Sequence, residues 1–364
     1  MKMQRKTQLL LLVGFVYIHF TAEPSSRSES EKINKISPTD KNLQYTGRID
    51  FDVPTEPIFH YSGSYITTRF SGTSLKASFS DHGDKIDYIG FIIDGGEMIK
   101  KSFDSTKTTV NVANELEDVV HDLIIVKCTG TNSGYVKFYG LELDEGRELI
   151  QPDPRPKRKI ELLGNSITSG SNSEFTGPGE DRDPLFHNGW LAFGCLTARA
   201  LGAEVHNVGI PGIGILAESS YTPKGAIDAF DKITPPWLPN VKNWNFKKFS
   251  PHVVILAYGT NDSSLSKNWK DKKENWNNAY KSIIENLLQR YQDAELVLCV
   301  PHMNSERKRI EKMVRKVAMS MHDRRVHYFD WKIPPSQDGH PNKTDHENMA
   351  KDLTDYIESI GISW

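Results

Sequence analysis

The sequence predicts an α/β protein in two parts, an antiparallel β-sandwich followed by a domain with a parallel sheet between helices. Three observations support this prediction. Residues 43–146 contain short β-type runs separated by turn residues, without a long helical period. Residues 159–364 alternate apolar strands with amphipathic helices, and a charged, proline-containing segment separates the two regions. The 364 residues are enough for two hydrophobic cores.

The N-terminus has the order of regions found in a signal peptide, which we predict over residues 1–22. Basic residues within the first six positions precede an apolar run from Leu9 to Phe20, and the small pair Thr21-Ala22 follows. This run is about 12 residues long, too short to cross a bilayer as a helix. The alternative is an anchor that is not cleaved. We therefore expect a secreted or periplasmic protein that does not associate with membranes after cleavage.

Residues 23–42 are rich in Ser, Glu, Lys and Asn, and we predict a flexible leader there. The sandwich is predicted over residues 43–146. Asp94-Gly95, between an apolar run and a second short run, is a typical hairpin signal. The strands predicted in this region are Tyr65–Phe70, Leu75–Phe79, Tyr88–Ile93, Thr109–Val112, Leu123–Val126 and Tyr135–Leu143.

Residues 147–158 are predicted as a linker, because Pro152, Pro154 and Pro156 exclude a helix or a central strand. Beyond it, the predicted domain occupies residues 159–364. Its reactive groups are expected at the carboxyl ends of the parallel strands. The predicted strands are Ile160–Leu163, Val205–Val208, Val253–Ala257, Leu296–Val300 and Val326–Phe329, and the predicted helices are Gly189–Leu201, Asn275–Tyr291, Ser305–His322 and His346–Ile360.

Three short segments carry residues suited to nucleophilic catalysis, two directly after predicted strands and one before the last helix. They are Gly164–Thr168, Tyr258–Asp262 and Asp338–Asn342. A serine hydroxyl is a poor nucleophile unless a base lies within hydrogen-bond reach, and histidine suits that role near neutral pH. Any one of these segments alone is more often structural. Their order along the chain favours a serine hydrolase with Ser166 as nucleophile and His340 as base.

These segments resemble the conserved blocks I, III and V of the SGNH hydrolases, and the glycine-rich loop Gly209–Gly214 resembles block II. The preceding all-β region and its proline-rich linker further resemble carbohydrate esterase family 2. That resemblance covers residues 45–360. It implies a jelly-roll sandwich in front of a flavodoxin-like three-layer SGNH domain, and the removal of O-acetyl groups from xylan- or glucomannan-type polysaccharide.

The resemblance also implies residue roles. Ser166 would attack the acetyl carbonyl, His340 would accept its proton, and Asp338 would orient the imidazole. The oxyanion would be met by the backbone N–H groups of Ser166 and Gly212 and by the side-chain amide of Asn261. Trp237, within a proline-rich segment, is our candidate for a cleft wall that stacks on sugar.

Two positions depart from the family pattern. Asn165 replaces the usual aspartate before the nucleophile, and Pro211 replaces the usual block II serine, so Gly212 alone can supply a backbone donor there. Asp262 follows Asn261 and could be mistaken for the triad acid, but we interpret it as a residue that shapes its loop. The spacing Asp-x-His at Asp338 and His340 is closer to the esterase family than to the superfamily.

The composition excludes several partners. Lys plus Arg is 45 and Asp plus Glu is 47, and this near balance does not favour nucleic acid. The histidines lack metal-ligand spacing, so we predict neither a metal nor another cofactor. Cys128, Cys195 and Cys299 are interpreted as buried thiols, although one disulfide remains possible. Two other functions stay open, a short-chain lipase or lysophospholipase on the same fold and an inert carbohydrate-binding protein.

Overall fold

The computed structural model describes residues 33–177, 180–262, 269–301, 303, 307–334, 336 and 339–364. The predicted signal peptide, the first part of the predicted leader and Asp338 lie outside these residues. Among the described residues, no helix combines the length and the apolar character needed to cross a membrane.

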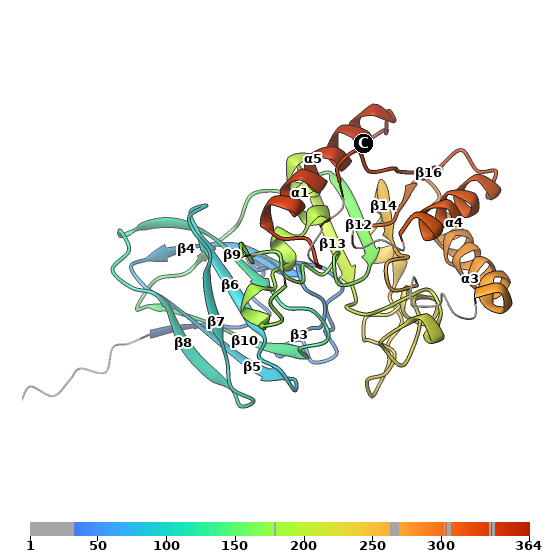
Figure 1. Ribbon diagram of the computed structural model, residues 1–364. Helices are drawn as coiled ribbons and strands as arrows, with labels where there is room; N and C mark the ends of the chain where they lie inside the picture. Colours follow the sequence, from blue (N-terminus) through green and yellow to red (C-terminus); the bar gives the residue numbers. More distant parts are fainter. Residues whose placement is uncertain are drawn as a thin grey trace, which may run out of the picture. The chain divides into compact units, whose positions relative to one another are not determined.

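The N-terminal part consists of two antiparallel sheets with a common core (Figure 1). Along β4 (Tyr65–Gly72), for example, buried and less buried residues alternate from Ile66 onward, as the period of two requires. The first sheet has the order β1 (Ile33–Ile36), β10 (Tyr135–Asp144), β5 (Leu75–His82), β8 (Thr108–Ala113), with β3 (Ile58–Phe59) on β10. The second has the order β11 (Leu149–Ile150), β4 (Tyr65–Gly72), β9 (Val119–Lys127), β6 (Tyr88–Ile93), β7 (Ile99–Ser102), with β2 (Gln44–Thr46) on β4.

The strands predicted for this region are confirmed, and so is the hairpin at Asp94-Gly95. That turn joins β6 to β7, and its two residues have φ values of 51° and 69°. Positive φ at both central positions is the requirement of a type I′ turn, whose twist matches that of the strands. The sequence therefore determined this connection locally.

The structure differs from the predicted boundaries at both ends of the sandwich. Part of the predicted flexible leader forms β1, which pairs with β10 and buries Ile36. Part of the predicted linker forms β11, which pairs with β4 and buries Leu149. These short edge strands contain too few apolar residues to show a period. Each forms because a long neighbouring strand offers unpaired backbone groups.

The C-terminal part is a parallel sheet between two layers of helices (Figure 1). Its strands have the order β13, β12, β14, β15, β16, which is 2-1-3-4-5 in chain order, the flavodoxin-like arrangement. The strands are β12 (Arg158–Gly164), β13 (Ala203–Gly209), β14 (Val253–Ala257), β15 (Glu295–Cys299) and β16 (Val326–Tyr328). Every strand predicted here is confirmed.

Apolar side chains on both faces of these strands explain the two helical layers. One face packs against α1 (Phe193–Ala200) and α5 (Lys343–Ser359), the other against α3 (Trp269–Arg290) and α4 (Arg307–Ser320). The remaining short helices are α2 (Ala226–Ala229), η1 (Pro184–Phe186), η2 (Gly189–Leu191), η3 (Ala217–Ser219) and η4 (Phe246–Lys248).

The strand order places a topological switch point between β12 and β14, because the chain leaves these neighbours in opposite directions along the sheet. Ligands bind at such points, outside the carboxyl ends of the strands. Ser166 follows β12 and Asn261 follows β14. The fold thus brings two of the predicted site residues to its natural binding position.

A buried ion pair joins the sandwich to the parallel sheet. The Arg48 guanidinium donates to Glu161 of β12 at 3.0 and 3.2 Å, and both side chains are fully buried. Arg48 also donates to the carbonyls of Phe230 and Lys232, while the Tyr291 hydroxyl donates to Glu161. Residues 33–364 consequently form one unit.

Candidate active site

Ser166 lies on a tight turn directly after β12. Gly164 permits this turn, because a Cβ at that position would come within 2.0 Å of the Thr168 hydroxyl. The side-chain oxygen of Asn165 accepts a hydrogen bond from the Ile167 N–H at 3.0 Å, and the Ser166 carbonyl accepts from Ser171. Asn165 therefore makes the hydrogen bond within the loop that an aspartate could make at this position. The turn places the Ser166 hydroxyl at the carboxyl edge of the sheet.

His340 meets Ser166 across this edge, although 174 positions separate the two residues. Its Nε2 lies 2.7 Å from the Ser166 hydroxyl oxygen, within hydrogen-bond distance. The loop before α5 carries the imidazole, and Asn342 caps that helix by accepting from the Asp345 N–H. This is the geometry in which a neutral imidazole can accept the serine proton.

The group at the other nitrogen of His340 is Glu180, a residue that the sequence did not single out. Its Oε1 lies 2.7 Å from His340 Nδ1. The hydrogen bond with His340 lowers the pKa of Glu180, which keeps the carboxylate ionised at neutral pH. A carboxylate there fixes the imidazole tautomer that leaves Nε2 free to accept a proton. Asp338, predicted for this role, lies outside the described residues.

Gly339 makes room for Glu180 beside the catalytic histidine. Its φ is +110°, a conformation that side-chain-bearing residues rarely adopt, and a Cβ there would lie 2.7 Å from Glu180 Oε2. Farther back, the Asp181 N–H donates to the Asn172 side chain at 3.2 Å, which ties this loop to the turn after Ser166. Both contacts hold the carboxylate against the imidazole.

The predicted oxyanion donors line the same pocket as Ser166 and His340, which has a volume of about 430 Å³. The backbone N–H groups of Ser166 and Gly212 donate to no acceptor among the described residues. The Asn261 side-chain nitrogen donates one hydrogen to the Ile213 carbonyl at 2.8 Å, which orients the amide and leaves its second hydrogen available. The three donor residues thus border the same pocket as the nucleophile.

Asp262 holds the surrounding loops in place through buried hydrogen bonds. It is fully buried, and its Oδ1 accepts from the Ile215 N–H at 3.0 Å, the Trp276 indole at 2.8 Å and the Ser219 hydroxyl. Burial raises its pKa to about 6. These bonds join the loop after β14 to the loop after β13, so Asp262 shapes the site without facing the reacting atoms.

The comparisons with known proteins agree with this geometry. Residues 162–356 match the model of the GDSL-like Lipase/Acylhydrolase family, which is more than half of the chain. The chain belongs to this family. Residues 45–153 match a second model, Carbohydrate esterase 2 N-terminal. The resemblance inferred from the motifs is therefore confirmed, and the GDSL-like domain is a carboxylic-ester hydrolase.

Named relatives align with most of this chain. Cellulase/esterase CelE of Acetivibrio thermocellus is 30% identical over 331 residues, which are 87% of this chain and 39% of that protein. An acetylxylan esterase / glucomannan deacetylase of Cellvibrio japonicus is 26% identical over 98% of both chains. The solved structure of a family two carbohydrate esterase from Clostridium thermocellum in complex with cellohexaose has a TM-score of 0.78 at 27% identity, covering 87% of this chain and 98% of that one.

The sandwich contributes directly to the pocket of this GDSL-like domain. Lys85 and Asn132, both from sandwich loops, line it beside the catalytic residues. Lys100 of β7 donates to Glu174 and to the Leu185 carbonyl, the latter at 2.6 Å, and so holds the segment that leads to and from Glu180. The sandwich therefore buttresses the catalytic loop as well as forming part of the wall.

Two histidines near the site are kept neutral by their surroundings. Burial lowers the pKa of His187, which lines the pocket, to about 4. His346 is fully buried on α5, where its Nδ1 accepts from the Phe193 N–H at 3.0 Å, and burial lowers its pKa to about 3. Only a neutral imidazole can accept that bond, so His346 has a structural role.

The structure does not place Trp237 in the cleft. That side chain is half-buried against the core shared with α3 and α4, and it is absent from the described lining of the catalytic pocket. Among the described residues that line this pocket is the aromatic Tyr221, which is 80% exposed. The proline-rich context of Trp237 does not distinguish a cleft wall from a core position, because prolines also occur in loops that pack on a core. Tyr221 stands in the polar, turn-rich segment 219–224, where an aromatic residue is unusual.

The three cysteines are buried and unpaired, as the interpretation of small apolar side chains required. Burial raises the pKa of the Cys128 thiol to about 12. Within the described ranges, no group of three or more His, Cys, Asp or Glu side chains is arranged to hold a metal ion. The chemistry supported by the described residues is that of the serine, histidine and glutamate together.

Proposed function

We propose that the protein is an exported esterase that removes O-acetyl groups from acetylated polysaccharide of the xylan or glucomannan type. The observation that carries this proposal is the chain of 2.7 Å contacts from Ser166 through His340 to Glu180. Relatives named as acetylxylan esterase and glucomannan deacetylase support the substrate class, and a neighbouring structure in complex with cellohexaose supports a β-linked glycan.

The reaction would proceed through an acetyl-enzyme. The Ser166 oxygen attacks the acetyl carbonyl carbon while His340 Nε2 takes the hydroxyl proton. The negative oxygen of the tetrahedral intermediate is met by the N–H groups of Ser166 and Gly212 and by the Asn261 amide. Collapse breaks the bond to the sugar oxygen, which leaves as a hydroxyl with the proton from His340.

Deacetylation reverses these roles for water. His340 removes a proton from a water molecule, whose oxygen attacks the acetyl carbon bound to Ser166. The second tetrahedral intermediate then releases acetate, and the serine oxygen recovers its proton from His340. Throughout both halves, the Glu180 carboxylate stabilises the imidazolium that forms.

Tyr221 would supply the sugar platform in this proposal. Tyr221 is 80% exposed and lines the pocket, so the apolar face of a pyranose can cover its ring. Arg182 and Asn132 lie along the same pocket and can donate hydrogen bonds to ring hydroxyls.

The remaining details of the proposal rest on sequence and comparison. The basic, apolar and small-residue order of residues 1–22 supports export to a secreted or periplasmic location. Two facing antiparallel sheets, together with the match to the carbohydrate esterase 2 N-terminal model, support a jelly-roll connection of the sandwich.

The test is the release of acetate from acetylated xylan, acetylated glucomannan and acetylated peptidoglycan by the purified protein. Ser166→Ala should abolish this release, while Ser105→Ala, which changes an exposed serine of the sandwich, should leave it intact. Full activity of a folded Ser166→Ala protein would refute the assignment.

A lipase function predicts a different preference. The catalytic pocket is bordered by Lys85, Arg182 and Asn132, which suit hydroxyls better than an acyl chain. We therefore expect 4-nitrophenyl acetate to be hydrolysed much faster than the octanoate. Faster hydrolysis of the octanoate would favour the lipase.

A further inference from the structure

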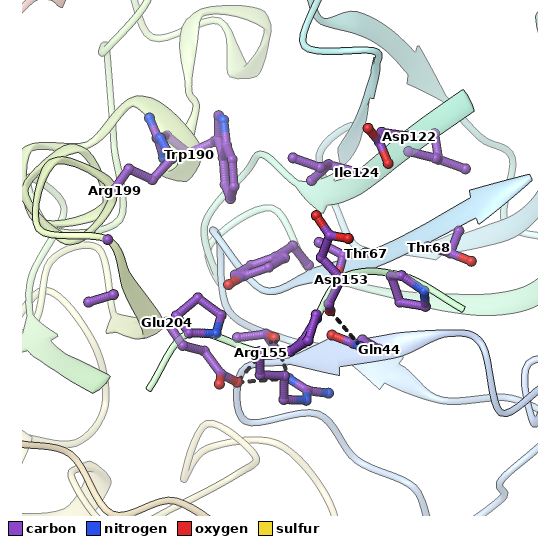
Figure 2. Close-up of a pocket in the computed structure, with 18 residues that line it drawn as sticks. Gln44, Thr67, Thr68, Asp122, Ile124, Asp153, Arg155, Trp190, Arg199 and Glu204 are labelled. Atoms are coloured by element: carbon purple, nitrogen blue, oxygen red, sulfur yellow. Dashed lines mark hydrogen bonds and ion pairs between the residues drawn. The ribbon is translucent and has the colours of Figure 1, made fainter. Parts of the chain in front are cut away.

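A second pocket lies between the sandwich and the parallel-sheet domain, away from the catalytic residues. Its volume is about 510 Å³, and Figure 2 shows the side chains that line it. Strands β2, β4 and β9 contribute one wall, and η2, the end of α1 and the start of β13 contribute the other. The proline-rich connector covers it with Pro152, Pro154 and Pro156. It shares no lining residue with the pocket at Ser166.

The walls of this junction pocket are mainly apolar and aromatic. Figure 2 shows Trp190 and Ile124 facing each other, with the Asp153 carboxylate below Ile124 in this view. The edge of the Tyr65 ring lies close to Trp190, with 5.2 Å between ring centroids. The Arg199 guanidinium lies over Trp190 at 4.2 Å from its ring centroid, on the side away from Ile124. The aromatic wall is therefore held in a fixed orientation.

Polar groups at the rim have unused hydrogen-bonding capacity. Asp153 is exposed, and its carboxylate has no partner among the described residues. Gln44 donates its amide to the Asp153 carbonyl at 3.1 Å, which leaves the Gln44 side-chain oxygen free to accept. Glu204, whose side chain is only 6% exposed, is paired through Oε1 with Arg155.

Within the described part of the chain, the side-chain oxygens of Asp153 and Gln44 are unpaired and can accept hydrogen bonds from ligand hydroxyls. The charges indicate which ligands fit. Arg199 already occupies one face of Trp190 and disfavours a cation there. Asp122 pairs with Arg69 and Glu204 with Arg155, so among the described residues the unpaired Asp153 carboxylate is the charge that disfavours an anion. A neutral ligand with several hydroxyl groups and one apolar face suits both kinds of wall.

We propose that this junction pocket binds a neutral sugar unit of the polysaccharide, as a second site separate from catalysis. The apolar face of the pyranose would lie along Trp190 and Ile124, and its hydroxyls would donate to Asp153 and to the Gln44 side-chain oxygen. The prolines of the connector limit rearrangement on binding, which lowers the entropic cost. The nature of the polymer rests on the proposed function; the pocket and its hydroxyl-binding groups do not.

The two pockets lie at opposite ends of the parallel sheet. Ala203 and Glu204 begin β13, whereas the catalytic pocket lies beyond the carboxyl ends of the strands. The seven residues of β13 span about 20 Å. A polymer can engage both pockets at once, and the second contact then raises the effective concentration of acetyl groups near Ser166. A small ester cannot benefit in this way.

The experiment uses affinity electrophoresis of the full chain in native gels that contain deacetylated glucomannan or xylan. The variants are Asp153→Ala, which removes the free carboxylate, and Thr67→Trp, which fills the pocket from β4. Asp104→Ala, an exposed aspartate elsewhere on the sandwich, is the matched control. Melting temperatures from circular dichroism show that each variant is folded. Tyr221→Ala, tested alone and together with Asp153→Ala, weakens sugar binding at the catalytic pocket and serves as the comparison.

We expect both pocket variants to weaken retardation by about tenfold in apparent affinity, as for the loss of a hydrogen bond to a charged group. Their effect should add to that of Tyr221→Ala, since separate sites contribute independently. On acetylated polymer, KM should rise with kcat retained. If the gels retard Asp153→Ala and Thr67→Trp as strongly as the wild type, the proposal of a second site is overturned.

Failure of the proposed function has a different signature. In that case the wild-type protein releases acetate from no polymer, while retardation that depends on Asp153 would still support the junction pocket. Conversely, acetate release with no effect of the pocket variants on binding or KM rejects the second site and leaves the esterase assignment standing.

Discussion

Replacing Glu180 by glutamine tests whether this residue, rather than Asp338, orients the catalytic histidine. The change keeps the size of the side chain and removes its charge. Glutamine can still accept from His340 Nδ1, so the tautomer is preserved, but the imidazolium formed in the transition state loses its anionic partner. The expected effect is therefore on kcat, with little change in KM.

The structure sets the size of this effect. The bond from Glu180 to His340 is 2.7 Å long and charge-assisted, a type that contributes about 1.5–3 kcal/mol. Each 1.36 kcal/mol is tenfold in rate, so a loss of about 10- to 150-fold follows. The Glu180 side chain is 26% exposed, and solvent screening favours the lower half of that range. A fully buried triad acid would cost about 10⁴-fold.

The assay is the kcat for 4-nitrophenyl acetate, measured for Glu180→Gln, Glu180→Asp, Asp338→Asn and the exposed control Glu358→Gln. We expect Glu180→Asp to recover part of the loss and Glu358→Gln to match the wild type. If Asp338→Asn lowers kcat strongly while Glu180→Gln does not, the contact at His340 Nδ1 is not the catalytic one.

Three further predictions address the oxyanion donors, the domain junction and acid stability. Asn261→Ala should lower kcat for 4-nitrophenyl acetate by about 10²–10³-fold, whereas an unchanged kcat would remove Asn261 from the oxyanion site. Arg48→Met leaves Glu161 buried without its cation and should lower the free energy of unfolding by about 3–5 kcal/mol in urea titrations. Adding Glu161→Gln should restore part of that loss, and no restoration would argue against an unpaired charge as the cause. His346 has a pKa lowered to about 3, so the unfolded chain binds its proton first as pH falls below about 6.5. The contribution of neutral His346 to the free energy of unfolding is complete above pH 6.5 and declines on acidification, by about 3 kcal/mol at pH 4.5. Calorimetry of His346→Gln should show a shallower decline of melting temperature between pH 6.5 and 4.5, and parallel curves for the two proteins would contradict this account.

The sequence by itself determined the elements whose signals are local or strongly periodic. The strands Val253–Ala257 and Glu295–Cys299 are nearly continuous apolar runs because both of their faces are covered. The Asp94-Gly95 turn needs positive φ at both residues. The nucleophile and its base could be predicted for a related reason. Ser166 and His340 stand at strand and helix boundaries, where topology alone brings chemistry to one edge of a parallel sheet.

Tertiary structure decided the features that depend on packing between distant segments. Glu180 lies in a loop with no periodic pattern, and its place at His340 comes from contacts with Gly339 and with the loop that Lys100 holds. The edge strand β1 exists only because β10 offers unpaired backbone groups. The junction pocket needs walls from both domains, so no single stretch of sequence could reveal it. Local sequence specifies local conformation, whereas the partners of a side chain follow from which surfaces the whole chain buries together.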